Sequence, residues 1–372
     1  MLNAEPEHAP GGWRNAVEPA ALVEAFVACP PEGFRAGTTR QGVPWFEATL
    51  DLLTTVDARL QRRVRSLALY PWLRRWTRWP TLFVGATVSE YLPLPCSLDL
   101  AALLQDLRDG ELGQRRRAHR LLIVKDIPID SPLLDDSDNA QAHTLVDRLR
   151  HAGFVLLQGQ AMAWVPIDCP SEEAYLASLS YTRRKNIRRK LRSRALLDIR
   201  LLGTGDPWLA DAGVRADLYA LYRAVYQQSE THFDLLTAAF FDAVLQDESN
   251  QGCLFVYREN GRLVGWNLCF EWGDTLVDKY IGLDYARSRE LNLYVVSWMA
   301  NLEHARRRGL KRFVAGWTDP QIKAELGARF TFTRHAIYPR SLLVRGLLKI
   351  FSGLFEGDRH WHERHGQAAT GT

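Results

Sequence analysis

The densest group of charged residues in the chain is the basic segment from Arg183 to Arg194. Eight of its twelve residues are Lys or Arg, and the next acidic residue is Asp198. The whole chain is nearly balanced, with 47 basic and 43 acidic residues, so this charge is concentrated locally. Without intervening acids the segment cannot form salt bridges along a helix, and it attracts phosphate groups or anionic lipid instead. We predict that it binds an anion through Arg184 and Arg188, with a solvated helix face as the alternative.

A second candidate is the loop QQSETHF, which lies between two predicted helices and contains Glu230 and His232. Histidine exchanges protons near neutral pH, and loops hold functional groups more often than the elements that they connect. We predict a proton-transfer role for Glu230 and His232. The alternative is that His232 caps the second helix or packs against Phe233.

A third candidate is the sequence Asp278-Lys279-Tyr280, which falls inside a predicted strand. A charged residue within a central strand is unusual unless the strand lines a cleft. Strand alternation places Asp278 and Tyr280 on one face and Lys279 on the other. We predict Asp278 and Tyr280 as catalytic residues, with the wet face of a half-covered antiparallel sheet as the alternative.

The composition is that of a globular protein. The chain has 372 residues, a length that favours two domains, and 47% of its residues are hydrophobic and 24% charged. No run approaches the 18 or so apolar residues of a membrane span, and the first residues lack a secretory signal, so we expect a cytoplasmic protein. Five scattered cysteines without metal-site spacing predict reduced thiols and no bound metal.

The elements that must position these residues alternate between strands and helices. Apolar runs predict strands at residues 81–92, 121–127, 154–165, 253–258, 262–272, 275–283 and 311–316. Apolar periodicity predicts helices at residues 51–69, 98–107, 139–151, 211–228, 237–245 and 290–308, and a further helix that runs from 171 into the basic segment. Asn260-Gly261 predicts a tight hairpin turn between two of the strands. The fold class is therefore α/β.

The second half of the chain has a recognisable order: two helices, a meander of three antiparallel strands, a loop, a helix and a strand. This order resembles the GNAT acyltransferase fold. The segments LSYTRRKNIRRKLR, LFVYRENGRLVGW, DKYIGLD and ARRRGLKRFVAGWTDPQIKAELGARF resemble those of FemAB-like and related GNAT-type N-acyltransferases. The resemblance covers residues 171–339, and over residues 43–165 it rests on topology.

The resemblance implies a mixed, largely antiparallel sheet flanked by helices, and two tandem GNAT-like domains. The expected ranges are a disordered tail at 1–12, an N-terminal domain at 13–168, a C-terminal acyltransferase domain at 169–341, and an amphipathic helix and tail at 342–372.

The resemblance also implies an N-acyltransferase without a tightly bound cofactor. An acyl-CoA, an aminoacyl-tRNA or a carrier-protein thioester is the co-substrate, and an amine is the acceptor. Asp278 would take a proton from the amine, and Tyr280 would return one to the leaving group. The loop DYARSRELN lacks the glycines of the usual pyrophosphate loop. The expected phosphate contacts in this loop are Tyr285, Arg287, Ser288 and Arg289.

An alternative function uses the same fold without catalysis. A degenerate GNAT-like scaffold would bind RNA or an anionic membrane through residues 183–194. Two further segments, YPWLRRWTRWP and LLVRGLLKIFSGLF, combine apolar and basic residues. They fit either peripheral contact with the inner face of a membrane or the packing seam between two domains.

Overall fold

The structure is a computed structural model that describes residues 12–52, 63, 66, 77–229 and 232–351. The chain forms two compact units. Unit 1 comprises Met1–Ala16, Gly33–Ala161 and Phe332–Thr372, and unit 2 comprises Val17–Glu32 and Met162–Thr331. The expected ranges are contiguous, whereas each unit here includes a segment from the other half of the chain. The chain passes from one unit to the other within strands β7 (Val155–Pro166) and β13 (Arg329–Pro339).

Unit 1 is built on a mixed sheet. An antiparallel meander of three strands, β2, β3 and β4, is followed by β6, which is parallel to β4, and by β13, which is antiparallel to β6. The bounds are β2 Arg35–Thr38, β3 Pro44–Asp51, β4 Arg78–Val84 and β6 Leu121–Ile129. Strands β1 (Trp13–Arg14) and β5 (Leu94–Pro95) form a separate antiparallel pair. Helices α4 (Leu100–Arg108), α5 (Glu111–Arg116) and α6 (Asp136–His151) complete the unit.

Unit 2 repeats this pairing pattern. Strands β8, β9, β10 and β11 are antiparallel neighbours, β12 is parallel to β11, and β7 is antiparallel to β12. The bounds are β8 Asp198–Gly203, β9 Gly252–Glu259, β10 Arg262–Trp272, β11 Thr275–Leu283 and β12 Arg312–Gly316. In both units the final strand of the sheet comes from the other half of the chain. The repeated order confirms the predicted largely antiparallel, tandem GNAT-like architecture.

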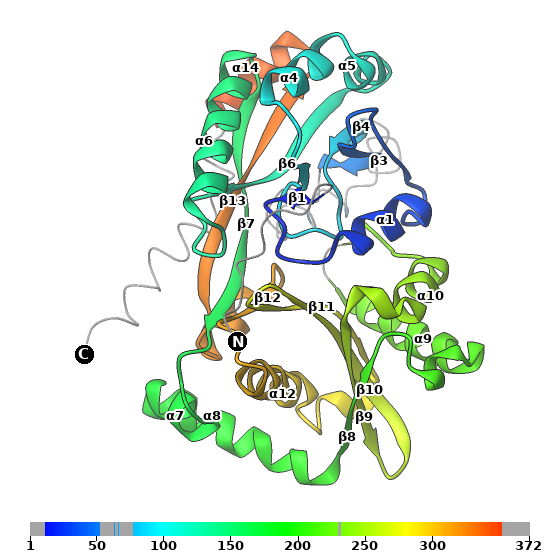
Figure 1. Ribbon diagram of the computed structural model, residues 1–372, viewed down its shortest axis with the longest axis vertical. Coiled ribbons are helices and arrows are strands. Elements are labelled where there is room, and N and C mark those ends of the chain that lie inside the picture. Colours follow the sequence, from blue (N-terminus) through cyan, green and yellow to red (C-terminus); the bar gives the residue numbers. More distant parts are fainter. Residues whose placement is uncertain (1–11, 53–62, 64–65, 67–76, 230–231, 352–372) are drawn as a thin grey trace. The chain divides into compact units, whose positions relative to one another are not determined.

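Helices cover both faces of the sheet in unit 2 (Figure 1). Helix α12 (Leu293–Arg307) lies on one face, and α9 (Ala212–Gln228) and α10 (Ala238–Gln246) lie on the other. Helix α1 (Ala20–Ala28) packs against α10. Shorter helices precede or follow the strands: α7 Glu172–Ser178, α8 Tyr181–Lys190, η2 Leu191–Leu196, η3 Pro207–Ala210, η4 Glu248–Asn250, α11 Tyr285–Ser288 and α13 Pro320–Glu325. In unit 1, α14 spans Leu342–Phe351.

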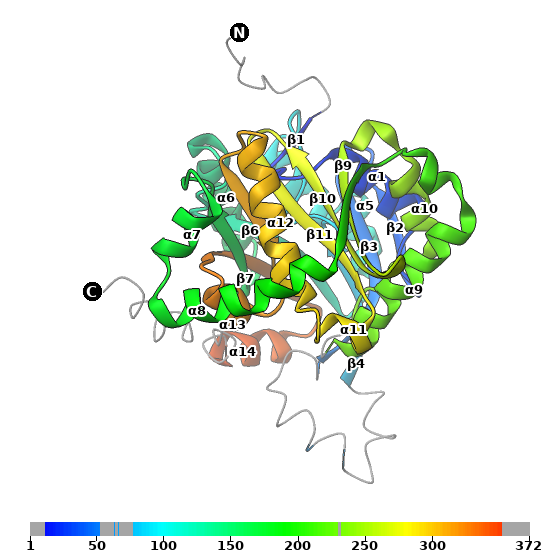
Figure 2. The same ribbon diagram turned by 90° about the horizontal axis from the view of Figure 1, so that it is seen from below.

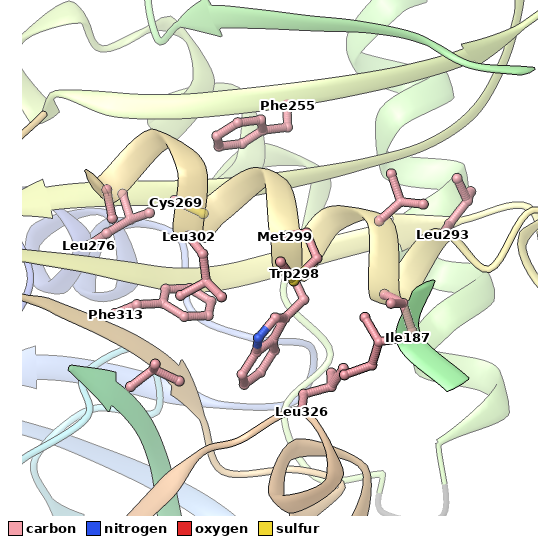
Figure 3. Close-up of a cluster of buried hydrophobic side chains, with 14 of the residues drawn as sticks. Ile187, Phe255, Cys269, Leu276, Leu293, Trp298, Met299, Leu302, Phe313 and Leu326 are labelled. Atoms are coloured by element: carbon pink, nitrogen blue, oxygen red, sulfur yellow. The ribbon is translucent and has the colours of Figure 1, made fainter. Parts of the chain in front are cut away.

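The core between α12 and the sheet explains why this helix forms where it does. Trp298, Met299 and Leu302 face the strands, and the Trp298 ring stands edge-on to Phe313 of β12, with ring centroids 5.1 Å apart (Figure 3). These side chains recur with a helical period, so burying them fixes the helix on the sheet. Gly309, with a φ of 71°, ends the helix in the left-handed conformation that glycine adopts most readily.

The helix predicted at 51–69 and the aromatic segment at 70–80 lie mostly outside the described residues, although Asp51 ends β3 and Arg78, Trp79 and Pro80 begin β4. Leu342 and Leu343 at the start of α14 are 75% and 82% exposed, so this end of the helix is apolar and accessible. Among the helices that the structure describes, none is both long and apolar enough to cross a membrane.

Candidate active site

The candidate site begins where β11 and β12 stop pairing. The register joins Thr275 to Arg312, Leu276 to Phe313 and Val277 to Val314, and no later pair is formed between these two strands. Strand β11 continues to Leu283, while β12 ends at Gly316. From residue 278 onward, the edge of β11 that faces β12 is therefore available for other hydrogen bonds. Main-chain groups on such an edge can hydrogen-bond an extended ligand.

Asp278 is the first residue of β11 beyond the last pair, and its carboxylate sits in a network of polar side chains. Asn301 of α12 donates from Nδ2 to Oδ2 (3.0 Å), and Asn267 of β10 donates from Nδ2 to Oδ1 (3.3 Å). The Cys269 thiol also points to Oδ1 (3.5 Å). Asn267 donates further to Oδ1 of Asn301 (3.0 Å) and accepts from the Tyr257 hydroxyl (2.7 Å), so the network holds the carboxylate in one orientation.

Burial dominates the acid–base behaviour of Asp278. Desolvation raises the pKa of its carboxyl group from about 3.8 to about 6, although the hydrogen bonds from Asn267, Cys269 and Asn301 and the charge of Lys323 oppose the shift. The group is ionised above pH 6 and exchanges protons closer to neutrality than an ordinary carboxylate. It therefore has the properties of a general base.

A β-bulge separates Asp278 from Tyr280. The register on β10 pairs Cys269 with Asp278 and Leu268 with Tyr280, so Lys279 is an extra residue on β11. The two side chains consequently point to opposite faces. Asp278 lies on the α12 side, while the Tyr280 ring packs edge-on against Phe240 and Phe241 of α10, at 5.7 and 5.3 Å. The expectation that Asp278 and Tyr280 share one face is wrong, because strict alternation does not continue through a bulge.

The start of α12 and the loop after β12 supply further polar groups near Asp278. Burial, together with the charges of Asp278 and Asp319, raises the pKa of Tyr294 well above its usual range. Lys323 of α13 is buried and donates from Nζ to the Ala315 carbonyl oxygen (2.5 Å). Asp319 is at the N-cap position of α13 with Pro320 next to it, but its side chain makes no capping hydrogen bond.

The residues that sequence reasoning missed are Asn301 and Tyr294. Asn301 is fully buried and lies among the apolar positions of α12, between Trp298 and Ala305. A polar amide within an apolar stripe needs buried partners, and this is the signal that could have identified it. Tyr294 falls on the apolar stripe of the same helix, so periodicity alone assigns it to the core.

The loop between β11 and α12 differs from a phosphate-binding cradle. It contains the short helix α11, and Asp284 caps that helix by accepting from the Ala286 amide (3.1 Å). Arg287 donates from Nε and Nη2 to the two carboxylate oxygens of Glu259 (2.9 and 2.6 Å), and it also contacts Glu290. Ser288 is buried. Of the predicted phosphate contacts, Arg287 is thus engaged in holding the loop and Ser288 is buried, whereas Arg289 is exposed and Tyr285 is half-buried.

The basic segment lies at the same end of α12 as this loop (Figure 2). Ile187 of α8 packs into the core beside Leu293, and the Ser193 hydroxyl donates to the Leu291 carbonyl oxygen. Arg194 pairs with Glu172 (2.9 Å), and Arg184 donates to the Ala177 carbonyl oxygen (3.2 Å).

Four of the six remaining basic side chains of the segment are open to solvent, while Arg183 and Lys190 are half-buried. Lys185, Arg188, Arg189 and Arg192 are exposed. In the part of the chain that the structure describes, none of these four cations has an acidic partner within ion-pair distance. The segment therefore presents uncompensated positive charge next to the start of α12.

The loop with His232 does not join this group of residues. Glu230 lies outside the described residues. His232 is exposed, and its ring stands edge-on to Tyr226 of α9 with centroids 5.0 Å apart. No hydrogen bond or ion pair in the described ranges links His232 to Asp278 or Tyr280.

Comparison with known proteins agrees with this geometry. A family model described as FemAB-like, peptidoglycan biosynthesis/recognition, matches residues 139–341. FemX superposes with a TM-score of 0.52 at 12% identity, covering 94% of this chain and 99% of that one.

Two further solved structures have the same fold. L-PGS from Bacillus licheniformis superposes with a TM-score of 0.51 at 10% identity, with 94% of this chain and 99% of that one covered. A C-terminal domain (DUF2156) from Agrobacterium fabrum, assigned to a lysylphosphatidylglycerol synthetase, gives a TM-score of 0.51 at 13% identity, with 89% and 90% covered. No curated protein matches the chain. Because the family model covers more than half of the sequence, the chain belongs to the FemAB-like family.

Proposed function

We propose that this protein transfers an aminoacyl group from aminoacyl-tRNA to an amine, with Asp278 as the general base. The observation that carries the proposal is the end of β11–β12 pairing at Val277 and Val314, directly before an oriented carboxylate with a pKa of about 6. A main-chain edge without a strand partner can bind the extended donor, and the adjacent carboxylate can accept a proton from the attacking nitrogen.

The reaction needs no chemistry beyond these groups. The acceptor nitrogen attacks the ester carbonyl carbon of the donor and forms an amide C–N bond. The C–O bond to the tRNA ribose breaks, and the ribose oxygen leaves as a hydroxyl. Asp278 takes the proton that the nitrogen loses and returns it to the departing ribose oxygen, so no proton is gained or lost overall. Tyr280 does not supply that proton in this proposal, since its ring packs on the opposite face of the sheet.

The surroundings of the loop before α12 favour tRNA over acyl-CoA as the donor. The loop has no glycine, and Arg287 is held by Glu259 and Glu290. The exposed cations of α8 and η2 form a wider surface next to this loop, which suits a nucleic-acid backbone better than a single pyrophosphate. Acyl-CoA and a carrier-protein thioester remain the competing donors.

The names of the family and of the similar structures indicate which acceptors to test. The family description refers to peptidoglycan biosynthesis, and one similar domain is assigned to a lysylphosphatidylglycerol synthetase. The acceptor panel should therefore contain amine-bearing peptidoglycan precursors. Phosphatidylglycerol vesicles should be tested beside them, because their acceptor group is a hydroxyl, and label on that lipid alone would contradict an amine acceptor.

The test incubates the purified chain with this panel and with a mixture of tRNAs charged with radiolabelled amino acids. Parallel reactions contain radiolabelled acyl-CoA, and Asp278→Asn is run beside the wild type. The proposal predicts label transfer from tRNA to an acceptor that disappears in the variant. Transfer from acyl-CoA alone would contradict the tRNA donor. Salt-sensitive tRNA binding without any transfer would instead support the scaffold function.

A further inference from the structure

Outside the candidate active site, three side chains converge at one point between β9, β10 and α12. They are Cys253 at the start of β9, Glu271 near the end of β10, and His304 in the last turn of α12. Their Sγ, Oε1 and Nε2 atoms all lie within 4.8 Å of one another. We infer that Cys253, Glu271 and His304 form a binding site for a zinc-like divalent transition-metal ion.

The spacing of the three donor atoms fits a tetrahedral ion. Zinc binds thiolate sulfur at about 2.3 Å and imidazole nitrogen or carboxylate oxygen at about 2.0 Å, so the edges from sulfur to nitrogen or oxygen are about 3.6 Å. The distances from Cys253 Sγ to His304 Nε2 and to Glu271 Oε1 are both 3.6 Å. The remaining edge, from His304 Nε2 to Glu271 Oε1, is 2.8 Å and must lengthen to about 3.3 Å. A solvent molecule would complete the four ligands.

A catalytic triad does not explain the same arrangement. In such a triad, the nucleophile and the orienting carboxylate contact different nitrogens of the histidine ring. Here Cys253 and Glu271 both approach Nε2.

Arg308 competes with a metal ion for Glu271. Its guanidinium lies 3.1 Å from both carboxylate oxygens, but its side chain is 61% exposed, so it can leave without opening the core. The ion would join the end of α12 to β9 and β10, one helical turn from Asn301, which donates to Asp278. The sequence does not suggest this site, because the three residues are far apart along the chain and come from three elements.

The test treats the purified full chain with a chelator, removes the chelator, and titrates Co²⁺ as a spectroscopic probe. The inference predicts one equivalent bound, with near-ultraviolet absorption from thiolate-to-cobalt charge transfer. Cys253→Ser should abolish that absorption, while the control Cys169→Ser, on another thiol of the same unit, should keep it. Zn²⁺ added afterwards should displace the cobalt.

A second pair of variants keeps the inference testable if Cys253→Ser fails to fold. Arg308→Ala should tighten Co²⁺ binding about two- to fivefold, as expected when a competing, partly exposed ion pair is removed. The neighbouring Arg307→Ala should leave the affinity unchanged. The inference is overturned if the wild type binds cobalt without the charge-transfer absorption, if it does not bind cobalt, or if Arg308→Ala and Arg307→Ala behave alike.

Discussion

Replacing Asp278 with Asn should make the protein less active and, as the pH rises, increasingly stable relative to the wild type. The pKa of this carboxyl group is raised by burial from about 3.8 to about 6 in the folded chain. The folded state then binds a proton more tightly than the unfolded state. The resulting stabilisation is present below pH 4 and is lost as the pH rises to about 6. The full pKa shift corresponds to about 3 kcal/mol of folding free energy. At pH 8 the wild type lacks this stabilisation, because its carboxylate is ionised, whereas a neutral side chain has no such ionisation cost.

The magnitude is best measured as a difference between two pH values. Packing changes caused by the substitution are nearly independent of pH, so they cancel in the difference between the two pH values. The contribution from ionisation of Asp278 depends on pH and remains in that difference. Relative to the wild type, Asp278→Asn should gain about 2 kcal/mol in the free energy of unfolding between pH 4.5 and pH 8. Urea titrations at both values, followed by tryptophan fluorescence, provide this quantity.

The activity of the same variant decides the role of the carboxylate. Removal of a general base should lower kcat by about 10²- to 10⁴-fold, and wild-type activity should rise with pH through about 6. A stability difference that stays constant between pH 4.5 and 8 would refute the raised pKa. A stabilised variant with full activity would refute the catalytic role while leaving the electrostatic reasoning intact.

Three further predictions concern the residues around Asp278. Arg188→Glu combined with Arg189→Glu should weaken tRNA binding and reduce the slope of log affinity against log salt. The expected reduction is about 0.9 for each phosphate that the protein no longer neutralises, and the control Arg307→Glu, at the other end of α12, should leave the slope unchanged. Equal slopes for the two variants in filter-binding assays would contradict this prediction. Tyr280→Phe should keep kcat within a few-fold, because its ring packs against α10, and a decrease of about 10²-fold would show that it is a general acid. Arg287→Ala should leave the donor KM unchanged, since Glu259 holds its guanidinium, whereas Arg188→Ala should raise it.

Local signals in the sequence were sufficient to predict the meander of unit 2. Asn260 and Gly261 adopt φ values of 49° and 81°, as the tight hairpin turn requires, and the strands on both sides fall where the apolar runs predicted them. Gly153 and Gly309, with φ values of 89° and 71°, end α6 and α12 at the expected positions. These features depend on neighbouring residues alone.

Strand pairings, bulges and ion pairs between residues far apart in the sequence were not predictable from local signals. Strand β13 was missed, and its pairing with β6 joins residues that are about 200 positions apart, such as Ile337 and Ile123. The bulge at Lys279 is visible only in the register between β10 and β11. Arg287 was predicted to contact phosphate, but it forms an ion pair with Glu259 of β9. The sequence does not reveal this ion pair, because the pair depends on how β9 lies beside the loop.

Hydrogen–deuterium exchange of the β11 backbone tests the central claim most directly. If the donor binds along the edge where β11 and β12 stop pairing, a non-hydrolysable aminoacyl-tRNA analogue should slow exchange of the amides at residues 278–283. Exchange at residues 275–277, which already pair with β12, should stay the same. Efficient turnover of aminoacyl-tRNA by a protein whose amides at 278–283 exchange equally with and without the analogue would contradict the account.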